Sequence, residues 1–152
     1  MKKSRAIRAQ GTSQDRAKSQ YQHGAHTTHR LRYHLVWTPK YRRRLLEGEI
    51  AVRLRQLLEE GCGVNDWLVH ELSIAPDHIH LLIQLPPHQS VARAVQILKG
   101  GSSKVIRAEQ PALDEWLWGK HFWSEGYFAE SVGRLEEGVI RRYISQQREP
   151  NS

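Results

Sequence analysis

The sequence has a single cysteine, Cys62, among its 152 residues, so no disulfide can form within the chain. A chain of this length can bury a hydrophobic core without disulfides, and the shortage of cysteine fits a reducing compartment. No apolar run approaches the ~18 residues that a membrane-spanning helix needs. The basic start of the chain also lacks the apolar segment of a signal peptide. We therefore expect a soluble, cytoplasmic protein.

Acidic residues are scarce at the start of the chain, which as a whole carries a formal charge of +7. Residues 1–26 hold six Lys or Arg against one acid, Asp15, so this segment carries +5 and the remaining 126 residues carry +2. Because the segment also lacks a sustained apolar period, we expect a basic, disordered tail at 1–26. Its charge would add affinity for polyanions that falls with salt, although ordinary solvated charge explains it equally well.

Hydrophobic periodicity divides the rest of the chain into seven elements. In order, these are a strand at 28–40, a helix at 47–63, strands at 66–76 and 78–85, a helix at 89–109, a strand at 121–133 that Gly126 breaks with a bulge or turn, and a helix at 134–149. The first six follow the order β-α-β-β-α-β, which predicts an α+β protein with a ferredoxin-like antiparallel sheet and its helices on one face. We expect one domain at 27–149, with residues 150–152 as a short tail. The Gly100-Gly101 pair predicts a bend or a close backbone approach within its helix.

Two histidines, His78 and His80, stand one residue apart in the strand at 78–85. Alternation turns one set of side chains toward the helices: Ile79, Leu81, Ile83 and Leu85. It turns the histidines to the opposite, uncovered face. Same-face neighbours on a strand lie roughly 7 Å apart at Cα, which suits two ligands of one divalent metal ion. The pattern also fits two surface histidines, so a third ligand is needed to decide.

The C-terminal helix offers a third ligand and a nucleophile. Tyr143 and Gln147 are four residues apart and therefore share one helical face. An activated tyrosine hydroxyl can attack an electrophile, and the amide oxygen of Gln147 can complete a His-His-Gln metal site. Taken alone, Tyr143 is also compatible with a packed aromatic beside Ile140 and Ile144, and Gln147 with a solvated amide.

Five motifs occur in an order that is specific enough to indicate a protein family. They are YHLVWTPKYRRRLL, APDHIHLL, LKGGSSKVIR, HFWSEGYFAESVG and VIRRYISQQ. Together they resemble the single-tyrosine HUH transposases of the insertion sequence 200/605 family, the IS200-like transposases. HUH stands for His-hydrophobe-His. The resemblance extends over residues 28–149. It implies that His78 and His80 bind a divalent cation, Mg²⁺ or Mn²⁺, with Gln147 as third ligand and Tyr143 as nucleophile.

The resemblance also implies an activity and partners. The family cleaves and rejoins single-stranded DNA at insertion-sequence ends through a 5′-phosphotyrosine intermediate, and recognises hairpins at those ends. It further implies a homodimer in which the C-terminal helix crosses over, so that Tyr143 of one subunit completes the histidine site of the other. A monomer whose helix folds back onto its own histidines is the alternative that the sequence leaves open.

Basic and aromatic residues supply candidate DNA contacts. The residues expected to hold phosphates are Lys40, Arg42, Arg43, Arg44, Lys99, Lys104 and Arg107. Trp116, Trp118, Trp123 and Tyr127 offer rings on which unpaired bases can stack. Of these, we expect Trp123 and Tyr127 to belong to the hydrophobic core.

Two further interpretations compete with a mobile-element transposase. The first is a domesticated HUH relative that processes chromosomal repeat hairpins. The second is a non-catalytic ferredoxin-like nucleic-acid-binding domain. Such domains stack bases on paired exposed aromatics of the first and third strands, and this sequence lacks that pairing.

Overall fold

The computed structural model describes residues 31–119 and 121–147. Its elements follow the predicted order, with two short additions. They are β1 (Leu31–Trp37), the 3₁₀ turn η2 (Lys40–Arg42), α2 (Gly48–Val64), β2 (Leu68–Ala75), β3 (His78–Leu85), α3 (Val91–Glu109), α4 (Leu113–Leu117), β4 (Phe128–Ser131) and α5 (Arg134–Gln146). The predicted tails at 1–26 and 150–152 lie outside the described residues. None of the described helices is long and apolar enough to cross a membrane.

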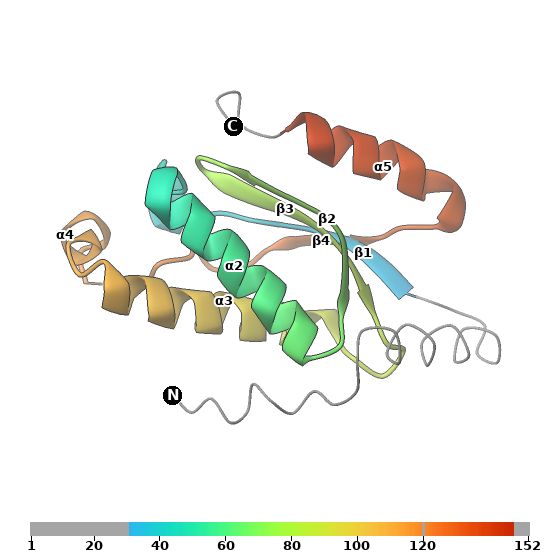
Figure 1. Ribbon diagram of the computed structural model, residues 1–152, viewed down its shortest axis with the longest axis horizontal. Coiled ribbons are helices and arrows are strands. Elements are labelled where there is room, and N and C mark those ends of the chain that lie inside the picture. Colours follow the sequence, from blue (N-terminus) through green and yellow to red (C-terminus); the bar gives the residue numbers. More distant parts are fainter. Residues whose placement is uncertain (1–30, 120, 148–152) are drawn as a thin grey trace.

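The four strands form one antiparallel sheet in the order β2-β3-β1-β4. This is the strand order of a ferredoxin-like fold, and α2 and α3 cover one face of the sheet (Figure 1). The predicted fold class is therefore confirmed. The two central strands, β3 and β1, bring the segment of the two histidines beside the first strand of the chain.

The main hydrophobic core lies between the sheet and the helices α2 and α3. Alternation in β3 sends Ile79, Leu81 and Ile83 into this core, where each is fully buried. The helices approach closely at Gly61, where an added Cβ would lie 3.2 Å from Cδ2 of Leu98. Gly100 and Gly101, by contrast, lie within an unbroken α3, and a Cβ at either would meet no described atom within 4 Å. The predicted bend or close approach at that pair is wrong.

The alternation pattern predicts that the opposite face of the sheet is uncovered, and this prediction is wrong. Helix α5 lies over it (Figure 1) and forms a second, smaller core from Leu82, Val132 and Ile144, with Ile140 beside them. Leu82 shares the face of the histidines, and its apolar side chain needs such a cover because exposure to water would cost free energy. The C-terminal helix is thus part of the fold.

The predicted strand at 121–133 is shorter than expected. Only Phe128–Ser131 pair with β1 as β4, and before them a single antiparallel bridge joins Trp123 to Pro39. Gly126, with φ +84°, interrupts the extended chain between the two. Before Gly126 the chain still pairs with the residues that follow β1, since the Lys40 N–H donates to the Phe122 carbonyl at 2.8 Å and the Ser124 N–H donates to the Thr38 carbonyl at 3.0 Å.

We predict that Ile83→Ala lowers the free energy of unfolding by about 2–5 kcal/mol, because it leaves a cavity in the main core. Val52→Ala is the matched control: Val52 lies on α2 with 61% of its surface exposed, and its truncation should cost no more than about 0.5 kcal/mol. Urea unfolding followed by circular dichroism measures both. Equal effects would contradict the assignment of this core.

Candidate active site

His78 and His80 occupy the start of β3 on the face that α5 partly covers. Their ring centroids are 4.9 Å apart with the planes at 82°. The His78 side chain is 18% exposed, whereas His80 is buried. The structure therefore brings the two predicted metal ligands together at one point on the sheet.

Each ring has a hydrogen-bond partner on its Nδ1 atom. Nδ1 of His78 lies 2.7 Å from Oδ1 of Asp77, and Nδ1 of His80 lies 3.0 Å from Nε2 of His34. A carboxylate only accepts hydrogen bonds, so the neutral form of His78 carries its proton on Nδ1 and has a lone pair on Nε2. This is how histidine ligands of metals are commonly oriented.

Asp77 also connects the site with the basic segment at 40–44, which holds Lys40, Arg42, Arg43 and Arg44. Nε of Arg42 donates to its Oδ2 at 3.0 Å. Partial burial acts to raise the pKa of Asp77, but the hydrogen bonds from His78 and Arg42, together with their charges, outweigh it and lower this pKa. Asp77 therefore stays ionised, as an acceptor for His78 must.

His80 is held in its neutral form. Its burial lowers its pKa to about 4, and the nearby imidazoles of His78 and His34 act in the same direction. A neutral imidazole is the form that binds a metal ion. The donor set therefore fits a divalent cation. Among the described residues, no three His, Cys, Asp or Glu side chains gather as a metal site, so further ligands would come from amide or phosphate oxygens.

His34 is a site residue that the sequence reasoning did not single out. Its ring stacks on that of His80, with centroids 5.2 Å apart and planes at 10°, and its Nδ1 lies 3.2 Å from Oε2 of Glu130. The signal was present in the sequence, because alternation places His34 on the outer face of β1. Using it required the neighbourhood of β1 and β3, which only the strand order supplies.

Tyr143 lies beside this site in the same chain. Its ring centroid is 5.5 Å from that of His80, with the planes at 88°, and 47% of the residue is exposed. The neighbouring Ile144 is fully buried and anchors the helix to the sheet. Tyr143 is thus not the packed core aromatic of the alternative interpretation. Gln147 follows at the C-terminal end of α5, where its backbone N–H donates to the carbonyl of Ile144 at 3.0 Å.

Polar contacts dominate the rest of the α5 interface. Glu137 pairs with Arg32 of β1 and, at 2.9 Å, with Arg141 of its own helix. Arg141 in turn donates to Nδ1 of His70 at 3.1 Å, and the Ser145 hydroxyl lies 3.2 Å from a carboxylate oxygen of Glu71. Among the α5 side chains that the structure describes, only Ile140 and Ile144 join the apolar contact, so this contact contributes little hydrophobic free energy.

The predicted basic segment wraps around the 3₁₀ turn η2. Arg43 lies over the rings of Tyr41 and Trp116, 5.6 Å from each centroid, and Arg44 pairs weakly with Glu47 at 3.8 Å. Lys40 also lies over Tyr41, at 5.5 Å. These contacts, together with that of Arg42 to Asp77, place the segment next to His78.

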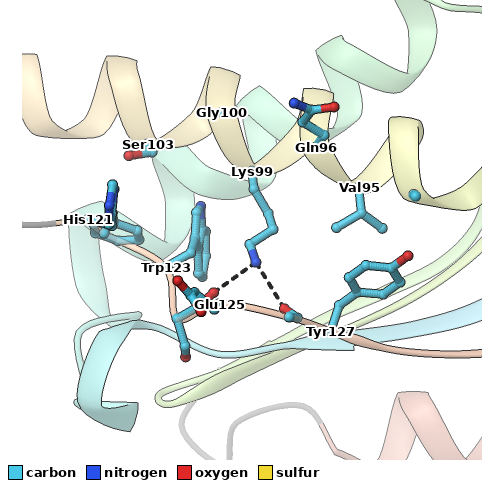
Figure 2. Close-up of a pocket in the computed structure, with 13 residues that line it drawn as sticks. Val95, Gln96, Lys99, Gly100, Ser103, His121, Trp123, Glu125 and Tyr127 are labelled. Carbon is cyan, nitrogen blue, oxygen red and sulfur yellow. Dashed lines mark hydrogen bonds between the residues drawn. The ribbon is translucent and has the colours of Figure 1, made fainter.

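The three residues of α3 that were predicted to hold phosphates lie elsewhere, since α3 and α5 cover opposite faces of the sheet (Figure 1). The Lys99 ammonium donates to the carbonyl oxygens of Ser124 and Gly126, at 2.8 and 2.9 Å, the two dashed lines of Figure 2. Burial lowers the pKa of Lys99, and Glu125 partly offsets this. Arg107 pairs with Asp114 at 2.9 Å, and Lys104 is exposed. The structure does not bring these three residues to the histidines.

The aromatic residues divide differently from the prediction. Trp123 is buried, as expected, and its indole N–H donates to the Ser102 hydroxyl at 3.1 Å. Tyr127 is 42% exposed and lines a cavity of about 610 Å³ between α3 and the segment at 121–127 (Figure 2). Its assignment to the core is therefore wrong: Tyr127 follows Gly126, whose positive φ interrupts the extended chain, and it lines the cavity instead. Trp116 and Trp118 are exposed.

Residues 27–147 match the family model described as "Transposase IS200 like". The chain therefore belongs to the IS200-like transposase family, a class of DNA-processing enzymes, as the resemblance predicted. It is 35% identical over 119 residues to the ISDra2 transposase TnpA of Deinococcus radiodurans, covering 78% of this chain and 85% of that relative. Identity to the transposase for insertion sequence element IS200 of Salmonella typhimurium is 34% over 125 residues, 82% of each chain.

Solved structures show the same fold. A putative transposase from Deinococcus radiodurans superposes with a TM-score of 0.66 at 30% identity, covering 81% of this chain and 95% of that one. A structure described as "REP associates tyrosine transposase bound to a REP hairpin" gives a TM-score of 0.57 at 13% identity, covering 75% and 64%. The second likeness speaks for the fold alone.

Proposed function

We propose that this protein is a metal-dependent transposase that cleaves and rejoins single-stranded DNA through a 5′-phosphotyrosine link to Tyr143. The observation that carries the proposal is the contact of the Tyr143 ring with His80, at 5.5 Å between centroids, in a family of transposases. An exposed phenol beside the neutral, buried imidazole of His80 suits tyrosine-based phosphoryl transfer. The direction of the link, to the 5′ side, comes from the family resemblance.

His78, His80 and Gln147 would hold the divalent cation, Mg²⁺ or Mn²⁺. When bound, such an ion withdraws charge from a phosphodiester and lowers the pKa of a nearby hydroxyl. Asp77 holds the ring of His78 through Nδ1. Burial keeps His80 neutral at physiological pH. Both side chains are thus prepared as ligands before any ion arrives.

Tyr143 supplies the covalent step. Its hydroxyl oxygen attacks the phosphorus, the bond from phosphorus to the 3′ oxygen breaks, and that oxygen leaves as a 3′-hydroxyl while the phenol loses its proton. The exchange replaces one phosphodiester by another, so no nucleotide cofactor is required. A second 3′-hydroxyl can later displace Tyr143 and rejoin the strands.

The DNA contacts follow from the surroundings of the site. Arg44 and the basic residues of η2 would hold phosphates near His78. The exposed rings of Trp116 and Trp118 would stack on unpaired nucleobases. The family resemblance implies recognition of hairpins, and a protein of similar fold was solved bound to a REP hairpin. We include a hairpin-bearing single strand in the proposal for this chain on that support.

We also propose a homodimer that shares its C-terminal helices. In the chain described, α5 lies on its own sheet. Its apolar contact with the sheet is small. The contacts that Glu137, Arg141 and Ser145 make are hydrogen bonds and ion pairs, and water can take the place of the partner groups. A helix held in this way can move to a second subunit at low cost.

The metal role predicts that His78→Ala or His80→Ala reduces cleavage by roughly 10³-fold, because several kcal/mol of charge stabilisation are lost. Binding of the hairpin should persist, since phosphate and stacking contacts lie elsewhere. Denaturing gels measure cleavage, and gel shifts measure binding. Normal cleavage by either variant in the presence of a chelator would contradict the role.

The nucleophile role predicts that Tyr143→Phe forms no covalent adduct, although it removes one exposed oxygen and should hardly change folding. Single-stranded DNA is incubated with Mn²⁺ and the products are separated on a denaturing gel. Tyr127→Phe, also exposed but on the other side of the molecule, is the matched control and should form the adduct normally. A non-catalytic DNA-binding domain would form no adduct even without substitution.

The shared helix predicts complementation between two inactive proteins. When Tyr143→Phe is mixed with the His78→Ala/His80→Ala double variant, a heterodimer should regain up to one complete site and form adduct. An independent label on each protein verifies that subunits have exchanged. Verified exchange without any recovery of adduct would show that Tyr143 acts on the histidines of its own chain.

A further inference from the structure

Three polar side chains from three neighbouring strands form a continuous series beside the site. Glu130 of β4 faces His34 of β1 as its direct cross-strand partner, and Oε2 of Glu130 lies 3.2 Å from Nδ1 of His34. The other nitrogen of His34, Nε2, lies 3.0 Å from Nδ1 of His80. Because Leu82 is the partner of His34 in β3, His80 is the same-face neighbour one step along. The sheet register therefore builds this series.

Glu130 is the exposed end of this series, and His80 is its buried end. The Glu130 side chain is 46% exposed, whereas that of His34 is 7% exposed and His80 is buried. Phe128 packs against the His34 ring at 5.9 Å between centroids. A carboxylate at the surface thus reaches a buried imidazole only through the ring of His34.

The direction of each hydrogen bond follows from the donors available. The Glu130 carboxylate has no proton to give, so it accepts from Nδ1–H of His34. A neutral His34 then has its lone pair on Nε2, and this atom accepts from Nδ1–H of His80. The remaining nitrogen of His80, Nε2, is left with a lone pair. His78 reaches the same state in one step, through Asp77.

We infer that Glu130 and His34 are positioning residues, which fix His80 in its Nδ1–H tautomer so that Nε2 can bind the divalent cation. The inference rests on the proposed function for the identity of the ion, but the tautomer itself belongs to this chain without any ion. The two imidazoles of the pair would then be oriented by two different carboxylates, Asp77 directly and Glu130 through His34.

Without the carboxylate, the two histidines can hydrogen-bond equally well in the reverse direction. His34 would then donate from Nε2–H to Nδ1 of His80, and the proton of His80 would move to Nε2, where it blocks the metal. Loss of Glu130 should therefore mix the two tautomers. Partners of this kind change metal affinity by about 10–100-fold when removed.

The test is long-range ¹H–¹⁵N NMR of the imidazole rings in the metal-free, ¹⁵N-labelled full chain, together with Mn²⁺ titration followed by electron paramagnetic resonance. The variants are Glu130→Ala and His34→Phe, which keeps a ring in the stack. Glu60→Ala is the matched control, because it removes an exposed carboxylate from α2 on the far face of the sheet. The His80 signals are identified by their loss in His80→Ala.

In the unmodified protein we expect His80 to carry its proton on Nδ1. In Glu130→Ala and His34→Phe we expect the Nε2–H form to appear and the Mn²⁺ dissociation constant to rise about 10–100-fold, with no change in Glu60→Ala. A proton on Nε2 of His80 in the unmodified protein would overturn the inference. So would an unchanged tautomer and an unchanged Mn²⁺ affinity in Glu130→Ala. Adduct formation is not a readout here, so a failure of the proposed nuclease activity would be recognised separately.

Discussion

Burial of the His80 imidazole is the constraint on which the rest of the site depends. A buried polar ring must be hydrogen-bonded, because an unpaired one costs free energy. A residue of the neighbouring strand supplies the hydrogen bond, since the register of β1 and β3 brings Nε2 of His34 to 3.0 Å from Nδ1 of His80. The same burial that demands a partner keeps the ring neutral, and a neutral ring is a competent ligand.

The two faces of β3 carry opposite tasks. On one face Ile79, Leu81 and Ile83 fix the strand in the main core, so the histidines between them are placed by rigid neighbours. On the other face only Leu82 is fully apolar, and α5 covers it with a few residues. The proposed nucleophile, Tyr143, therefore lies on the weakly held helix α5, and the proposed ligands His78 and His80 lie on the firmly packed strand β3. A proposed exchange of α5 between subunits is compatible with that division.

Periodicity in the sequence was sufficient for the fold class and for the faces of β3, because each strand reports its own alternation. Periodicity could not predict which segments far apart in the sequence lie in contact. His34 and Glu130 are 96 residues apart, and only the strand order brings them together. For the same reason the sequence left open whether the C-terminal helix lies over the histidine face of its own sheet, as α5 does. Tyr127 was misplaced because the break at Gly126, which the sequence indicates, does not reveal which of the aromatic side chains around it reach the core.

The central claim is that Tyr143 bonds covalently to DNA. The most direct measurement is mass spectrometry of tryptic peptides after incubation of the unmodified protein with Mn²⁺ and single-stranded, hairpin-bearing candidate ends. The account predicts a nucleotide joined through its 5′ phosphate to the peptide that contains Tyr143. A nucleotide on Tyr127 or Tyr33 would contradict it, as would cleaved DNA without any protein-bound product.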